Sequence, residues 1–260
     1  MSTRFKPVVG LIRSWDTKTD KWRYPVIIDN MMNLELLEWA AQYSDSTKFA
    51  KIASSHAKLT MKNHFRKDFS SYHVIGYDPE TGEIEKRNTH QGYAHESAWA
   101  RGQAWGLYGY TMMFRETGDS SYLHHAKGIA RFIMSHPNMP KDKVPYWDFN
   151  APNIPHAKRD ASAAAIMASA FIELSTLTKE EPDFSKQCLN MAEMQLRTLT
   201  SAEYLAKKGT NGGFILMHSV GNLPKGTEVD VPLTYADYYY VEALVRYKKM
   251  VLGTLKSKKN

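Results

Sequence analysis

The chain has 260 residues, of which 43% are hydrophobic and 23% charged, the ordinary mixture of a globular protein. Its length fits one large domain or two small ones, and its composition excludes a collagen and a low-complexity linker. No apolar run reaches the roughly 18 residues of a membrane-spanning helix, so we expect no membrane partner. The net charge of +7 fits an acidic small molecule or an oligosaccharide, and the absence of any recognisable nucleic-acid module makes nucleic acid a weak candidate.

Seven helices are predicted, separated in pairs by long loops. Apolar residues recur at a helical period from Met32 to Tyr43, and a second helix opens at the N-cap pair Asp45-Ser46. Residues 65–95 and 137–155 break the pattern and predict long loops. The other helices are expected over residues 97–116, from residue 119, and over residues 161–177, 184–200 and 235–252.

The helices follow one another as hairpins, which predicts an all-α fold. Asp45, Asp119 and Glu181 each begin a segment that opens a helix directly after another helix ends. Hairpins that cannot bury a face alone must stack or close into a ring. Seven helices make three and a half hairpins, whereas a closed six-hairpin toroid needs twelve helices. We therefore expect an incomplete (α/α)6 toroid, either an open array or the later part of a longer protein.

Small residues mark the helices that we expect on the inside. Gly102, Gly106 and Gly109 lie in the helix over 97–116, and alanines fill the helix over 161–177. Glycine inside a helix costs about 1 kcal/mol relative to alanine, so three of them indicate close packing or the close approach of a ligand.

Asp29 is a candidate general acid. It follows the apolar run Val26-Ile27-Ile28 at the start of a helix, where an N-cap role is the simpler interpretation. Apolar surroundings would instead disfavour its charged form, raise its pKa and let it hold a proton near neutral pH. The sequence leaves both interpretations open.

Arg101 and Trp105 are candidate ligand-binding residues. They are four residues apart, so they lie on one helix face, and a guanidinium beside an indole suits a ligand with a carboxylate and a ring. An Arg–Trp packing pair in a helical core is the alternative. The glycine directly after each residue favours a ligand, because it clears space beside them. His73 and Gln91, in the preceding long loop, could complete a polar rim.

Other chemistries lack their motifs. The sequence has no Gly-x-Ser-x-Gly, no His-Glu-x-x-His, no phosphate-binding Gly-x-x-x-x-Gly-Lys and no Cys/His metal cluster, so metal and nucleotide chemistry are both disfavoured. Cys188 is the only cysteine and cannot form an internal disulfide. The basic carboxyl end, with Lys256, Lys258 and Lys259, is interpreted as a solvated terminus.

Several motifs together resemble those of one family. They are Tyr24-Pro-Val-Ile-Ile-Asp-Asn-Met-Met-Asn, Gln91-Gly-Tyr-Ala, Trp99-Ala-Arg-Gly-Gln-Ala-Trp, Pro145-Tyr-Trp-Asp-Phe, Arg159-Asp-Ala-Ser and Tyr235-Ala-Asp-Tyr-Tyr-Tyr. In this order they resemble the unsaturated glucuronyl hydrolases, glycoside hydrolase family 88, over nearly the whole chain.

The resemblance implies a single (α/α)6-type glycosidase domain over residues 1–260. It implies hydrolysis that removes a Δ4,5-unsaturated uronic acid from the non-reducing end of oligosaccharides cut by a lyase. By the resemblance Asp29 is the general acid and base, and His73, Gln91, Arg101 and Trp105 contact substrate. Trp15 matches an aromatic residue of the sugar subsite. The implied mechanism needs one carboxyl that protonates C4 of the vinyl ether, in contrast to the two carboxyls of ordinary glycosidases, and it implies no metal and no organic cofactor.

The chain departs from this family at its amino end. Family members carry a further stretch of roughly a hundred residues with a second aspartate, so we expect a chain that lacks this stretch and is a poor enzyme alone. Two alternatives remain: a rhamnogalacturonan-type hydrolase, which typically has Arg-Gly-Asn-Gly-Trp in place of Arg101-Gly-Gln-Ala-Trp105, or an inactive carbohydrate-binding remnant. The first residues lack the apolar stretch of a signal peptide, so we expect a cytoplasmic protein, or a periplasmic one if a preceding region carries a signal.

Overall fold

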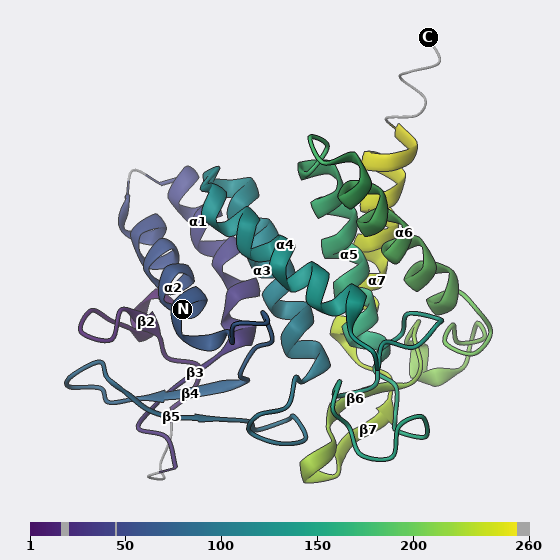
Figure 1. Cartoon of the computed structure of the whole chain (residues 1–260), viewed down its shortest axis with the longest axis horizontal. Coiled ribbons are helices and arrows are strands. Elements are labelled where there is room, and N and C mark those ends of the chain that lie inside the picture. The colour runs from purple at the N-terminus through teal and green to yellow at the C-terminus, as the bar shows by residue number, and fades with distance from the viewer. Residues whose placement is uncertain (17–20, 45, 254–260) are drawn as a thin grey trace.

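The computed structural model describes residues 1–16, 21–44 and 46–253. Asp45 and the three terminal lysines of the predicted solvated end lie outside the described residues. Seven α-helices form the framework of this part of the chain (Figure 1): α1 (Leu34–Gln42), α2 (Lys48–His64), α3 (Ala100–Thr117), α4 (Ser120–Ser135), α5 (Ala161–Leu177), α6 (Pro182–Leu199) and α7 (Thr234–Arg246).

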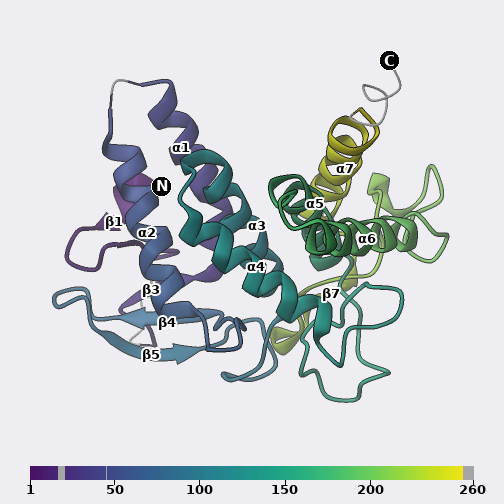
Figure 2. The same cartoon turned by 45° about the horizontal axis from the view of Figure 1, so that its top comes forward.

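The predicted hairpins are present. Helices α1 and α2, α3 and α4, and α5 and α6 pack as sequential pairs, and α5 also packs against α3 and α7. Asp119 accepts a hydrogen bond from the backbone N–H of Ser121 at 3.0 Å and so caps α4. One cluster of buried apolar side chains joins all seven helices. Figure 2 shows α1 to α4 on one side of the molecule and α5 to α7 on the other. The described part of the chain is thus mostly helical and built of hairpins, and the toroid stays a prediction.

The prediction of an all-α fold is wrong in part, because the described chain also contains three small antiparallel sheets. They are formed by β1 (Phe5–Lys6) with β2 (Leu11–Ile12), by β3 (Tyr24–Ile27) with β4 (Val74–Tyr77) and β5 (Ile84–Asn88), and by β6 (Ser219–Asn222) with β7 (Thr227–Val231). Strands β4 and β5 occupy the segment predicted as loop. All four residues of β4 are buried, because the strand lies between two neighbours.

Helices α3 and α5 are deeply buried, as their small residues predict. Residues 161–175 of α5 are buried throughout. A Cβ on Gly109 would lie 2.4 Å from Cβ of Met31, so α3 packs directly against the 3₁₀ helix η2 (Ile28–Asn33). Close packing explains the glycines of α3. The space beside Gly102 and Gly106 is filled by side chains of this chain, namely those of Trp99 and Ile28 and that of Phe65.

Helices α3, α5 and α7 share one direction through the molecule. Arg101, Asp160 and Tyr235 lie at or near their N-terminal ends and belong to one network, whereas Arg115, Glu173 and Arg246 lie near their C-terminal ends and belong to another. The N-terminal ends of the three helices meet close to the sheets β3–β5 and β6–β7, which lie at the same end of the helices in Figure 1.

Candidate active site

The register of the sheet β3–β4–β5 brings three segments to one edge. Ile27 pairs with Val74, and Val74 pairs with Asn88. Asp29 follows β3, His73 precedes β4 and Gln91 follows β5, so all three leave the sheet at this edge. A strand prediction alone would have placed them together, although they are far apart in sequence.

Asp29 lies in the first turn of η2, and the N-cap interpretation is wrong. The residue at the cap is Ile27, and no side chain caps this helix. The side chain of Asp29 is 23% exposed, and within the described chain its Oδ2 atom is buried without a hydrogen-bond partner. Burial raises its pKa to about 6, and the nearby charge of Arg101 and the indole of Trp105 oppose this rise. A carboxyl with this pKa is partly protonated near neutral pH.

His73 faces Asp29 and is held in one tautomer. Its Nδ1 atom accepts backbone N–H groups of His90 and Gln91, both at 3.2 Å. Because a nitrogen that accepts hydrogen bonds carries no proton, the neutral ring bears its proton on Nε2. This atom lies 3.8 Å from Oδ2 of Asp29 and has no closer partner among the described residues. Burial holds the pKa of His73 well below 6.5, so the ring is neutral.

Stacking fixes the plane of the His73 ring. The ring lies 4.3 Å from the Trp99 ring, centroid to centroid, at an interplanar angle of 27°. Trp99 immediately precedes α3 and is buried. The two unpartnered atoms, Oδ2 of Asp29 and Nε2 of His73, are thereby held on opposite sides of a short gap. A substrate atom or a water molecule placed there could bond to both.

Arg101 lies near both Asp29 and His73 and is 2% exposed. It forms an ion pair with Asp160 at 3.1 Å and donates to the carbonyl oxygens of Val220 and Gly221. Its guanidinium carbon lies 4.5 Å from the centroid of Trp99. Arg101 is thus built into the wall of the site, with three hydrogen bonds inside the protein.

Trp105 and Gln91 complete the constellation. Trp105, one turn after Arg101, is buried against Tyr239 with ring centroids 5.2 Å apart. Gln91 donates its side-chain amide to the carbonyl of Gly221 at 2.8 Å, the same oxygen that accepts Arg101. Through this hydrogen bond from Gln91, the loop after β5 is connected to strand β6.

Trp15 lies at the outer edge of the constellation. Its ring contacts those of Trp22 and His90, at centroid distances of 5.7 and 5.9 Å. His90 in turn lies 6.4 Å from the ring of His73. The structure therefore brings all six predicted residues into one continuous set of contacts.

Asp160, His90 and Tyr235 are neighbours of the site that the sequence analysis did not single out. Asp160 accepts a hydrogen bond from the backbone N–H of Ser162 at 3.0 Å, so its sequence context indicates only a helix cap. Its second partner, Arg101, lies 59 residues earlier in the chain and is not indicated by that context. Tyr235 lies 5.3 Å from the Arg101 guanidinium, and only its place in a quoted motif pointed to it.

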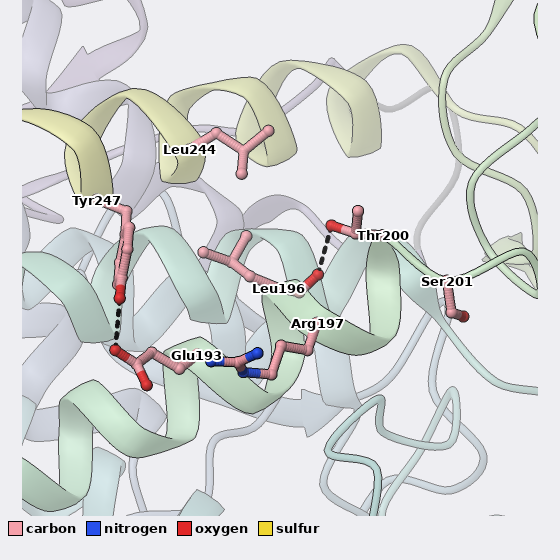
Figure 3. Close-up of a pocket in the computed structure, with 7 residues that line it drawn as sticks. All are labelled: Glu193, Leu196, Arg197, Thr200, Ser201, Leu244 and Tyr247. Carbon is pink, nitrogen blue, oxygen red and sulfur yellow. Dashed lines mark hydrogen bonds between the residues drawn. The ribbon is translucent and has the colours of Figure 1, made fainter.

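Two hollows on the surface lie outside this constellation. A cavity of about 500 Å³ lies between α6 and α7 and contains none of the predicted site residues (Figure 3); Tyr247 at its edge donates to Glu193 at 2.6 Å. A second, of about 650 Å³, lies between α1 and α7 and is lined partly by Tyr235 and Tyr239, which contact Arg101 and Trp105. The second hollow adjoins the site.

Within the part of the chain that the structure describes, no group of three or more His, Cys, Asp or Glu side chains is placed to hold a metal ion. No helix in the described ranges has the length and apolar character needed to cross a membrane.

Comparison with known proteins gives close relatives, although no family model matches the chain. An unsaturated glucuronyl hydrolase of Formosa agariphila is 51% identical over 96% of this chain and 61% of its own length. An unsaturated glucuronyl hydrolase of Bacillus sp. (strain GL1) is 34% identical over 96% of this chain and 66% of its own length. The chain thus spans less than two thirds of the length of these relatives.

Solved structures agree with these relatives. A crystal structure described as an unsaturated glucuronyl hydrolase specific for heparin aligns with a TM-score of 0.92 at 55% identity, over 96% of this chain and 66% of that one. A variant of the Streptococcus agalactiae enzyme in complex with dGlcA-GalNAc6S aligns with a TM-score of 0.75 at 35% identity, over 86% and 59%. In sequence and in the arrangement of its helices and sheets, the chain belongs to the unsaturated glucuronyl hydrolase family.

Proposed function

We propose that this protein removes the Δ4,5-unsaturated uronic acid from the non-reducing end of glycosaminoglycan oligosaccharides produced by a lyase. The observation that carries the proposal is the gap between Asp29 and His73. A carboxyl with a pKa of about 6 faces an imidazole N–H donor across 3.8 Å, and each atom lacks a partner within the described chain. Unpartnered buried polar atoms that face one another are typical of a place where substrate completes the bonding.

The chemistry needs a single carboxyl that first donates a proton and then accepts one. Protonated Asp29 gives its proton to C4 of the vinyl ether, and positive charge develops at C5 and the ring oxygen. A water molecule adds at C5 and returns a proton to Asp29. The hemiketal formed at C5 opens to a ketone, which leaves a hemiacetal at C1, and its collapse expels the remaining sugar.

The other residues would bind and orient this substrate. The Nε2–H of His73 would donate to the sugar beside Asp29 and keep the carboxyl aimed at the double bond. The N-terminal ends of α3, α5 and α7 meet at the site, and their dipoles favour an anionic uronate there. Trp15, which is half-buried, offers an aromatic face for a sugar ring, and the buried indole of Trp105 lies against Asp29.

The relatives guide the choice of substrate. The structure at 55% identity is described as specific for heparin, and a second relative was solved with an unsaturated sulfated disaccharide. A heparin-type disaccharide is therefore the first substrate to test, followed by chondroitin and hyaluronan disaccharides.

Turnover and binding should be measured separately. The purified protein is mixed with each unsaturated disaccharide, and the ultraviolet absorbance of the C4=C5 bond is followed. Binding is measured by calorimetry, with the saturated disaccharide as the matched control. Loss of absorbance supports the proposed hydrolase. Binding without turnover would favour a carbohydrate-binding protein. The absence of both turnover and binding would overturn the proposal. Turnover of unsaturated rhamnogalacturonyl disaccharides alone would favour the related hydrolase class.

A further inference from the structure

Asp160 occupies a position that its role as a helix cap does not fully explain. Its Oδ1 atom accepts the backbone N–H and the hydroxyl of Ser162, at 3.0 and 2.6 Å, and so caps α5. The same oxygen accepts the backbone N–H of Val220 at 3.3 Å. The second oxygen, Oδ2, is turned away from the helix and pairs with Arg101 at 3.1 Å. One fully buried carboxylate therefore connects α5, β6 and α3.

A second aspartate in the chain shows what a cap alone looks like. Asp119 caps α4 with the same geometry, accepting the backbone N–H and the hydroxyl of Ser121 at 3.0 and 2.6 Å. Its other oxygen faces Lys58 at 4.0 Å in an exposed pair. The two caps are alike in their contacts with the helix. They differ in that only the second oxygen of Asp160 meets a buried guanidinium.

We propose that Asp160 is a positioning residue for the reaction: it fixes Arg101 near Asp29 and screens the charge of this guanidinium. The inference rests on the proposed function of Asp29 as the proton donor. Arg101 also donates to the carbonyls of Val220 and Gly221, so the contacts of Asp160 with Val220 and Arg101 hold the acceptors and the donor in one unit.

Electrostatics gives the pairing a consequence for Asp29. A guanidinium paired with a carboxylate acts at a distance as a dipole, whose field falls off faster than that of a lone cation. The groups that face Asp29 are Arg101 and Trp105 from α3, His73 from the residue before β4, and Tyr235 from α7. His73 and Tyr235 are held neutral, since burial lowers the pKa of the former and raises that of the latter. Arg101 is therefore the charge that opposes protonation of Asp29, and Asp160 is its counter-ion.

The test compares Asp160→Asn with Asp119→Asn. Asparagine caps a helix about as well as aspartate, so both variants keep the cap and lose one negative charge. The pKa of Asp29 is measured directly from the pH dependence of its ¹³C carboxyl resonance, assigned by its loss in Asp29→Asn. Without its counter-ion, Arg101 should favour ionised Asp29, so we expect Asp160→Asn to lower this pKa by about half a unit or more. Asp119→Asn should leave it unchanged.

A double variant keeps the test decisive if Asp160→Asn does not fold. Asp160→Asn combined with Arg101→Met removes both charges, so no buried ion is left alone. The pKa of Asp29 should then rise above that of the unmodified protein, because the opposing cation is gone. A pKa that moves equally in the two cap variants, or that does not rise in the double variant, would overturn the inference. Because the resonance reports protonation without turnover, a protein that proves inactive would refute the proposed hydrolase and still test the role of Asp160.

Discussion

The two ends of helices α3, α5 and α7 differ in how completely the buried charged and polar side chains nearby are paired. At the C-terminal ends, Arg115 pairs with Glu35, Glu116 and Glu173, and Arg246 pairs with Glu173 and Glu242. No side-chain atom of these residues is buried without a partner. At the N-terminal ends, Asp29 and His73 each present such an atom.

This difference indicates that the C-terminal ends stabilise the fold, whereas the N-terminal ends carry the candidate active site. A network in which every charge is paired holds helices together, whereas unpartnered polar atoms cost stability and are retained where a ligand satisfies them. Arg101 and Arg115 lie on the same helix, about 21 Å apart at 1.5 Å per residue. Substitutions at one end should therefore change turnover, and substitutions at the other should change the free energy of unfolding.

Asp29→Asn should have the largest effect. Loss of the only proposed proton donor should lower kcat by up to about 10⁴-fold, the upper range for general acid–base catalysis. The free energy of unfolding should change little or rise, because a buried carboxyl becomes a neutral amide. The measurement is the loss of C4=C5 absorbance, with Asp183→Asn, an exposed carboxyl on α6, as the control. Turnover at a tenth of the original or better would assign the proton to another group.

Glu173→Ala should chiefly affect stability. Glu173 joins Arg115 at 2.6 Å to Arg246 at 2.7 Å and is itself buried. Its removal leaves two guanidiniums short of a partner and should cost about 3–5 kcal/mol of unfolding free energy. Urea denaturation measures the loss. The matched control is Glu181→Ala, in an exposed pair with Lys127, which should cost less than about 1 kcal/mol. Equal losses of unfolding free energy in the two variants would show that burial of the network does not increase its contribution to stability.

Acid should destabilise the protein through its buried histidines. Burial lowers the pKa of His125 to about 4, whereas its unfolded value is about 6.5. Because the folded value is the lower one, its stabilising contribution is complete above pH 6.5 and declines as the pH falls toward 4. Between pH 6.5 and 5 the loss should be about 1.5 kcal/mol. His125→Phe should flatten this slope in denaturation curves, and His156→Phe, at an exposed position, should not. An unchanged slope in His125→Phe would exclude His125 as a source of acid sensitivity.

Trp15→Ala should have the smallest effect. Trp15 is half-buried at the outer edge of the site, where one face can stack on a sugar ring. Its loss should weaken disaccharide binding by about 1 kcal/mol without changing stability much. Trp39, an exposed tryptophan on α1, is the control, and Trp39→Ala should leave binding unchanged. If the two variants bind the disaccharide with equal affinity in calorimetry, Trp15 does not belong to the binding site.

The sequence predicts the helices more accurately than the strands for a physical reason. The starts of α4 and α5 are encoded locally, by Asp119 and Asp160 with a serine two residues later. Strand β4 contains Gly76 and is followed by Pro79, so it resembles loop. Its partner β3 lies about 50 residues earlier in the chain, and local periodicity does not detect such a pairing.

The sequence predicts which residues belong to the candidate site, but it does not predict the hydrogen bonds between them. The motifs correctly place Asp29, His73 and Gln91 near the helix with Arg101. The orientation of each side chain depends on contacts between distant segments. Nothing in the sequence near Arg101 indicates that Asp160 and the carbonyl of Gly221 hold its guanidinium.

The shared direction of α3, α5 and α7 has a consequence for how this architecture can diversify. Each of these three helices begins at the same end of the molecule. The segments that connect the hairpins there can change in length and sequence while the paired charges at the far end remain as they are. New ligand preferences can therefore arise by exchange of connecting loops, without renewed selection of the helical scaffold. Libraries that randomise only residues 93–96 and 223–226 should retain the fold while they sample new sugars.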